Sequence, residues 1–204
     1  MSTNTISETI LGSRSNVRVL RVLCGVSVAL SIKQIAQQAQ LTRPAVNAAL
    51  ERLEQTGVVF VTRSGNVRLY QLEQENIYVT QIINPLFSLE HDLRDFMIND
   101  IKEALGKTAL SITMFGSFAR GDQELTSDVD ILVVVSDAVH QKEFERILTD
   151  YAPRFYRRFG HALEALVYDY KQACQLHERA PGLYAEIQDD GYLIKGTTDW
   201  MNHE

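Results

Sequence analysis

A glycine–serine turn with two aspartates closely following it is the feature that most restricts how this chain can fold and act. An apolar segment ending at Phe115 leads into Gly116 and Ser117, which predicts a strand that passes into the first turn of a helix. Backbone N–H groups at a helix start can bind an anion, and glycine allows a phosphate to approach the backbone closely. The hydroxyl of Ser117 adds a further donor.

The two aspartates, Asp128 and Asp130, directly precede the apolar run Ile131–Val135. Residues two apart on a strand share a face, so these carboxylates repel each other unless a cation lies between them. Carboxylate oxygens are suitable ligands for Mg²⁺. Taken alone, Asp-x-Asp is more often a solvated strand end. Together with the glycine–serine turn it predicts a site for a metal–triphosphate, and phosphoryl transfer needs mainly positioning and charge neutralisation there.

The charge distribution divides the chain into two parts. Residues 1–75 contain eight Lys/Arg and five Asp/Glu, a net charge of +3, whereas the remainder carries −9. This asymmetry predicts two units with different partners. The cysteines, Cys24 and Cys174, have neither metal-ligand spacing nor a disulfide framework, and the sequence contains no signal peptide and no apolar run of about 20 residues. We therefore expect a cytoplasmic protein with no membrane span.

The first third of the chain has the order helix, short helix, helix and hairpin. Ser31 and Thr42 are expected to begin the second and third helices, and residues 64–66 supply the turn between two strands. In this order, residues 12–73 resemble bacterial regulators with a winged helix-turn-helix fold. We assign residues 1–75 to such a domain.

This resemblance implies DNA binding. The outer face of the third helix is expected to read base edges, and the wing is expected to contact phosphates. The DNA-binding candidates on these two elements are Arg43, Asn47, Arg52, Arg63 and Arg68. Glu51 on the same helix opposes strong affinity. The alternative use of the domain is protein contact or dimerisation.

Residues 76–106 are expected to form a helical connector, broken near Pro85, that packs on one domain or on a second copy in a homodimer. After it, strands alternate with helices around the buried strand 129–135, which predicts an α/β layer. The expected fold class is therefore α+β, with residues 107–204 as the second domain.

The motif of this second domain resembles the nucleotidyltransferase superfamily related to DNA polymerase beta. The resemblance covers residues 108–204 and includes the Ala119-Arg120-Gly121 step. It implies a mixed sheet with flanking helices, two Mg²⁺ ions, and transfer of a nucleoside monophosphate from an NTP with release of pyrophosphate. AMP from ATP is favoured over transfer from another NTP. By position, Gly116 and Ser117 would hold the distal phosphates, and Asp128 and Asp130 would be catalytic metal ligands.

The family usually has a third carboxylate on a later strand, which binds metal and can act as a base. Glu164 is the best candidate here, and Asp169 is a weaker one. Glutamate in place of the common aspartate leaves the geometry open. Arg120 is a candidate for nucleotide contact or, alternatively, for pairing with the acids at 122 and 124. His161 is expected to be a loop histidine rather than a catalytic base.

Two functions of different classes remain open. The first is a nucleotidyltransferase that modifies a hydroxyl of a partner protein or other acceptor and is coupled to a DNA-binding domain. Minimal family members of this kind often act as antitoxins, and the winged helix would then serve autoregulation. The second is a non-enzymatic transcriptional regulator whose degenerate domain senses nucleotide. A small-molecule modifier is less favoured, because no acceptor domain is visible in the sequence.

Overall fold

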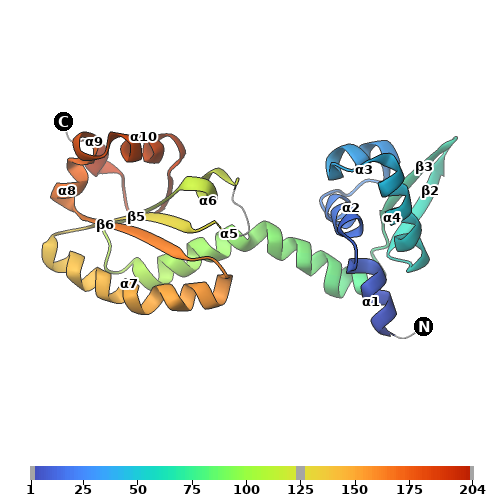
Figure 1. The fold of residues 1–204 in the computed structure, drawn as a ribbon, viewed down its shortest axis with the longest axis horizontal. Helices are drawn as coiled ribbons and strands as arrows, with labels where there is room; N and C mark the ends of the chain where they lie inside the picture. Colours follow the sequence, from blue (N-terminus) through green and yellow to red (C-terminus); the bar gives the residue numbers. More distant parts are fainter. Residues whose placement is uncertain (1–2, 123–126, 203–204) are drawn as a thin grey trace. The chain divides into compact units, whose positions relative to one another are not determined.

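The computed structural model describes residues 3–122 and 127–202, and the chain divides into two compact units, Met1–Asp92 and Leu93–Glu204. The division falls inside helix α5 (Asn84–Leu105), within the segment expected as a connector (Figure 1). Each unit is described by itself below.

The first unit is a winged helix-turn-helix, as the sequence predicts. Its three-stranded antiparallel sheet has the order β1-β3-β2, and its hairpin pairs Val59 with Leu72 through to Ser64 with Val67. Its elements before α5 are α1 (Thr3–Leu11), α2 (Arg14–Cys24), β1 (Leu30–Ser31), α3 (Ile32–Ala39), α4 (Arg43–Gln55), β2 (Val59–Ser64), β3 (Val67–Leu72) and the π-helical turn η1 (Val79–Ile83).

Side-chain caps define where the helices of this unit begin. Ser31 and Gln34 form a reciprocal capping box on α3, and the Thr42 side chain accepts a hydrogen bond from the backbone N–H of Ala45 at the start of α4. Helix α2 is capped by Ser13, whose side chain accepts a hydrogen bond from the backbone N–H of Asn16. The inner faces of these helices then bury a shared core: Val19, Leu20, Leu23, Ile35, Val46, Leu50 and Leu53.

The second unit is built on a four-stranded mixed sheet with the order β6-β5-β4-β7. Strand β5 pairs antiparallel with β4 and parallel with β6, which confirms the expected mixed sheet. The short edge strand β7 was not expected. The elements after α5 are β4 (Ser111–Phe115), α6 (Gly116–Arg120), β5 (Val129–Val135), α7 (Ala138–Phe159), β6 (Leu163–Asp169), α8 (Tyr170–Cys174), α9 (Leu176–Arg179), α10 (Pro181–Asp190), β7 (Tyr192–Lys195) and the 3₁₀ turn η2 (Asp199–Asn202).

Strand β5 is covered on both faces, which explains why it is apolar at almost every position. Ile131 and Val133 pack into a core with α7 and the C-terminal part of α5, whereas Leu132 and Val134 pack into a core with α8, α9 and α10. Figure 1 shows α7 on one side of the sheet and α8–α10 on the other. Because side chains alternate along a strand, Asp130 belongs to the face of Leu132.

Cys24 and Cys174 are free and half-buried, in agreement with the sequence. Within residues 3–122 and 127–202, no helix combines the length and apolar character that crossing a bilayer requires.

Candidate functional site

The glycine–serine turn joins β4 to α6 in the expected way. Phe115 is extended, Gly116 has a φ of 72°, and α6 ends at Gly121, whose N–H donates to the carbonyl of Ser117. The amides of the first helical turn lack carbonyl partners within the helix, so they remain available to an anion. Gly116 is buried and Ser117 is half-buried at this turn.

The carboxylate of Asp130 lies directly against Gly116. The two strands place Phe115 opposite Asp130, and a Cβ added at Gly116 would lie only 2.7 Å from Asp130 Oδ2. The left-handed backbone conformation favours glycine at position 116, and a side chain there would also displace the Asp130 carboxylate. The fold thus brings together the turn and the second aspartate, which are fourteen positions apart in the sequence.

Glu164 faces the same side of the sheet as Asp130. The parallel strands β5 and β6 pair these two residues in register. Asp128 lies just before β5, and it is exposed, as is Glu164, whereas Asp130 is half-buried. Three carboxylates from two neighbouring strands therefore occupy one end of the sheet, beside the glycine–serine turn.

Electrostatics at this end of the sheet favour a cation. Burial raises the pKa of Asp130, and the carboxylates of Glu164, Asp128 and Glu186 raise it further. Among residues 3–122 and 127–202, no group of three or more His, Cys, Asp or Glu side chains is already arranged to hold a metal ion. The donor chemistry and the excess of negative charge nevertheless fit a hard divalent cation, for which carboxylate oxygens are the preferred ligands.

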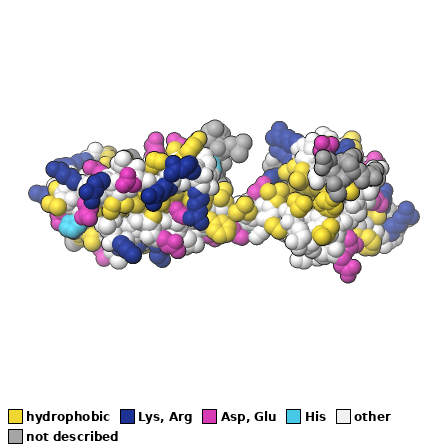
Figure 2. All heavy atoms as spheres, turned by 90° about the horizontal axis from the view of Figure 1, so that it is seen from below, with side chains coloured by type: hydrophobic (Ala, Val, Ile, Leu, Met, Phe, Trp, Pro, Cys, Tyr) yellow, Lys and Arg dark blue, Asp and Glu magenta, His cyan; other side chains and the backbone are white. Residues whose placement is uncertain are grey.

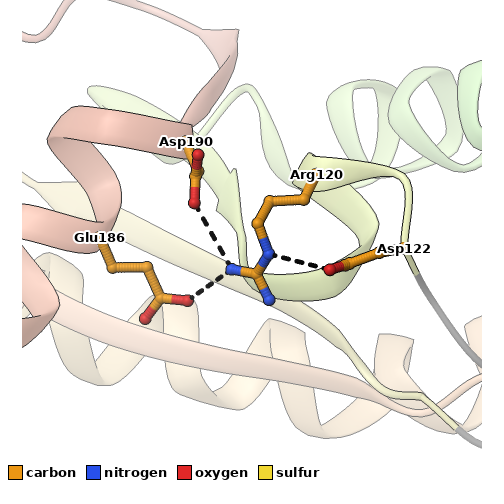
Figure 3. A network of polar contacts seen from close by, with 4 residues as sticks. All are labelled: Arg120, Asp122, Glu186 and Asp190. Carbon is orange, nitrogen blue, oxygen red and sulfur yellow. Dashed lines mark hydrogen bonds and ion pairs between the residues drawn. The ribbon is translucent and has the colours of Figure 1, made fainter.

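Arg120 is held by carboxylates (Figure 3). Its Nε lies 3.4 Å from Asp122, and its Nη1 lies 3.1 Å from Glu186 and 3.6 Å from Asp190. The pairing with Asp122 is the one considered from sequence, whereas Glu124 lies outside the described residues. Sequence reasoning missed Glu186 and Asp190, whose only signal was their spacing of four on α10. Arg120 therefore links α6 to α10 and brings Glu186 near Asp130.

The DNA-binding candidates of the first unit have different environments. Arg43 and Arg63 are exposed, and Figure 2 shows basic side chains at the far edge of this unit, where the hairpin projects in Figure 1. Asn47 donates to Glu51, and Arg68 pairs with Glu54 and lies over the ring of Tyr70.

Arg52 does not lie on the outer face of α4, where the sequence pattern placed it. Its Nη2 donates to Asn16 Oδ1 at 2.9 Å, and Asn16 is almost completely buried in α2. The Asn16 amide in turn donates to the carbonyl of Thr9. A buried amide oxygen needs a donor, and Arg52 supplies it. This contact directs the guanidinium inward.

The second unit is similar to known proteins. A family model described as "Nucleotidyltransferase domain" matches residues 96–187. A Methanocaldococcus jannaschii protein named "Putative protein adenylyltransferase" is 32% identical over 69 residues, which are 34% of this chain and 69% of that protein. The chain belongs to the nucleotidyltransferase family.

The nucleotidyltransferase match spans the part of the chain from Gly116 to Glu164, which contains the candidate site. The second unit is therefore a transferase domain. A second M. jannaschii protein of the same name is 31% identical over 71 residues, which are 34% of this chain and 48% of that protein. The chain therefore spans about half the length of that relative. A structure of a "predicted DNA-binding transcriptional regulator from E. coli" has a TM-score of 0.36 and 16% identity, covering 44% of this chain and 87% of its own.

We predict that Asp130→Asn raises the melting temperature of the metal-free nucleotidyltransferase at neutral pH. The raised pKa of Asp130 in the wild type means that the folded state disfavours the charged carboxylate. The free energy of unfolding therefore decreases as the pH rises through that pKa. The gain from the amide should therefore shrink as the pH falls toward the usual range of aspartate. Calorimetry in a chelator at neutral and acidic pH measures this. Asp150→Asn, at an exposed position on α7, is the control, and a lower melting temperature for Asp130→Asn at neutral pH contradicts the prediction.

Proposed function

We propose that this chain is a Mg²⁺-dependent nucleotidyltransferase that transfers AMP from ATP to a hydroxyl group, coupled to a DNA-binding winged helix. The contact of the Asp130 carboxylate with Gly116, beside Glu164, carries the proposal. It joins an anion-binding turn and a cation-binding pair in one place. The two free thiols support a cytoplasmic location for this activity.

The chain's own residues divide the work as follows. The backbone at Gly116 and the hydroxyl of Ser117 bind the distal phosphates, while Asp128, Asp130 and Glu164 would hold up to two Mg²⁺ ions. When bound, Mg²⁺ neutralises phosphate charge and lowers the pKa of a coordinated hydroxyl. The acceptor oxygen bonds to the α-phosphorus, and the bond from that phosphorus to the pyrophosphate oxygen breaks. Glu164, the most exposed acid of the strand pair, accepts the hydroxyl proton.

Nucleotide contact by Arg120 requires an exchange of partners. Its guanidinium already binds Asp122, just after α6, and Glu186 on α10, and exposed ion pairs of this kind contribute little to stability. A triphosphate carries more charge than any one of these acids. Competition for Arg120 is therefore favourable to the nucleotide, and we propose Arg120 as a nucleotide-binding residue on this ground.

The acceptor is proposed to be a partner protein. Both M. jannaschii relatives carry the name of protein adenylyltransferases, and the resemblance to minimal family members suggests an antitoxin that modifies its toxin. In this proposal the partner presents its own hydroxyl to the site. The winged helix would then couple modification to autoregulation of transcription.

Transfer is tested with ATP labelled on its α-phosphate, Mg²⁺ and a lysate or candidate partner protein. Asp128→Ala and Asp130→Ala should each lower label transfer on the order of 10²-fold, because several kcal/mol of charge stabilisation are lost. Asp150→Ala, on the exposed face of α7, should leave transfer unchanged. Equal transfer by the wild type and by the two site variants would contradict the proposal.

The second function is a regulator that senses nucleotide without turnover. The observation in its favour is that, within the described residues, no set of three ligands is preassembled for a metal, and Glu164 is exposed. The same experiment separates the two. Saturable ATP binding with no label transfer to any protein, to water or to the chain itself would support the sensor.

DNA binding is proposed for the outer side of α4 and the hairpin. Arg43 at the start of α4, Asn47 one turn later and Arg63 on the wing support it, because they are accessible to a duplex. Arg68 can reach phosphates only in exchange for Glu54. Arg52 is proposed to act indirectly, by holding α2 and α4 together. A net charge of +3 on residues 1–75 implies weak, salt-dependent binding by one copy.

We predict that Arg43→Ala impairs DNA binding and leaves stability unchanged, whereas Arg52→Ala lowers stability. Arg43→Ala should weaken binding to a labelled random-sequence duplex and lower the salt slope by about one, with an unchanged melting temperature. Arg52→Ala should reduce stability by about 1–3 kcal/mol, since it leaves the Asn16 oxygen buried without its donor. Anisotropy at two salt concentrations and thermal unfolding measure both variants, and each serves as the control for the other. Loss of stability in Arg43→Ala but not in Arg52→Ala would reverse the assignment.

A homodimer is proposed through one side of η1 and the N-terminal part of α5. Ile82, Leu86 and Leu89, spaced four and three residues apart, are 41%, 36% and 53% exposed. On the inner side, Ile83 and Phe87 are buried in the core of the first unit. Spacings of four and three make a continuous apolar seam on a helix, the pattern of helix pairing. Two winged helices per dimer would also compensate for the weak binding of one.

We predict that Leu89→Glu shifts the full chain from dimer to monomer in sedimentation velocity experiments, because it places like charges in the seam. Gln81→Glu adds the same charge at an exposed position beside the seam and should leave the dimer intact. A wild-type chain that sediments as a monomer at all concentrations tested would refute this part of the proposal.

A further inference from the structure

His161 contacts residues adjacent to both halves of the candidate site. Its Nδ1 lies 2.9 Å from the backbone carbonyl oxygen of Ser127, the residue directly before Asp128. Its ring lies edge-to-face against Phe118, with 4.9 Å between the centroids and 79° between the planes. Phe118 directly follows Ser117 and is buried in the core of the second unit. The half-buried His161 ring therefore contacts two segments, one next to Asp128 and one next to Ser117.

The hydrogen bond defines the state of the ring. A carbonyl oxygen only accepts, so Nδ1 must carry the proton and donate it. In the neutral ring Nε2 is then unprotonated, and the tautomer is set by the partner of Nδ1. The contact with Phe118 fixes the plane of the ring, since an edge-to-face pair has a preferred geometry. The two contacts together leave His161 little freedom to rotate.

The position of His161 in the chain extends this connection to the third carboxylate. His161 lies in the link between α7 and β6, three residues before Glu164. The adjacent residue Ala162 accepts a backbone hydrogen bond from Val129 at the start of β5. The ring thus sits where the segments before Asp128 and Glu164 and the helix after Ser117 come together.

We propose that His161 is a positioning residue, which holds Asp128 in place relative to the glycine–serine turn. The proposal rests on the nucleotidyltransferase function above, and it assigns no proton transfer to His161. Without the bond to Ser127, the backbone directly before Asp128 loses the link that the His161 ring provides to Phe118 on α6. The metal-dependent part of nucleotide affinity should then fall, because groups that orient metal ligands typically contribute about 10- to 100-fold to metal binding.

The plain alternative is a histidine that only stabilises a loop. The chain offers a matched example of it in α9, where His177 Nδ1 lies 3.1 Å from the carbonyl oxygen of Cys174 and its ring lies edge-on to Tyr184. His177 therefore makes the same two kinds of contact without touching either half of the motif. A purely structural role predicts that equivalent substitutions at the two histidines have equivalent effects.

The test measures affinity for α,β-methylene-ATP, which lacks the bond cleaved in transfer, with Mg²⁺ and with a chelator. His161→Phe keeps a ring against Phe118 but removes the donor to Ser127, whereas His161→Asn removes the ring but can still donate. We expect His161→Phe to lower the ratio of the affinity with Mg²⁺ to the affinity with chelator about tenfold or more. His161→Asn should keep a ratio close to that of the wild type. His177→Phe should leave the ratio unchanged.

Melting temperatures of all variants are measured alongside. A wild-type ratio in a folded His161→Phe overturns the proposal, and so does an equal loss in His161→Phe and His177→Phe. If the wild type itself shows no Mg²⁺-dependent affinity, the nucleotidyltransferase function fails instead, and the two failures are thereby distinguished.

A measurement on the wild-type chain covers the case in which His161→Phe does not fold. The ¹⁵N shifts of the His161 ring report which nitrogen carries the proton. We expect a protonated Nδ1 and an unprotonated Nε2 in the neutral ring. The opposite tautomer would mean that the bond to Ser127 is absent, and the proposal would be overturned.

Discussion

The structure of the second unit depends on one close approach, that of the Asp130 carboxylate to the backbone of Gly116. Burial and neighbouring acids make this position unfavourable for a negative charge. A fold driven by stability alone would place an apolar or amide side chain here. The aspartate at this point is therefore a local cost, which the proposed cation would offset, and electrostatically unfavourable groups of this kind cluster at functional sites.

The packing of β5 in the second unit holds Asp130 in this unfavourable position. Strand β5 is covered on both faces, and its apolar side chains form two cores, one with α5 and α7 and one with α8–α10. Because both faces of the strand are packed, the backbone at its polar end is held in place. The parallel strand β6 then brings Glu164 into register with Asp130. A site on a buried strand is positioned more precisely than one on a loop. The sequence of β5 thus serves both the core and the site.

Local signals were sufficient for the elements and for the motif. Capping residues such as Thr42, the period of the helices and the apolar run of β5 each act within a few residues, so the helices, the hairpin and the turn at Gly116 could be predicted. The winged helix and the mixed sheet were expected from the two family resemblances. Contacts between distant segments could not. Arg52 was expected on the outer face of α4, but the buried amide of Asn16 draws it inward. Likewise, nothing near Arg120 in the sequence indicates that Glu186, on a helix far along the chain, is its partner.

The proposed function requires that the carboxylates at the ends of β5 and β6 hold a divalent cation beside a nucleotide bound at the glycine–serine turn. A crystal structure of the full chain with Mn²⁺ and α,β-methylene-ATP, with anomalous data at the manganese edge, tests it most directly. We expect an anomalous peak among Asp128, Asp130 and Glu164, with the nucleotide phosphates next to Gly116 and Ser117. Nucleotide bound elsewhere, or manganese absent from these three carboxylates while the nucleotide is in place, would contradict it.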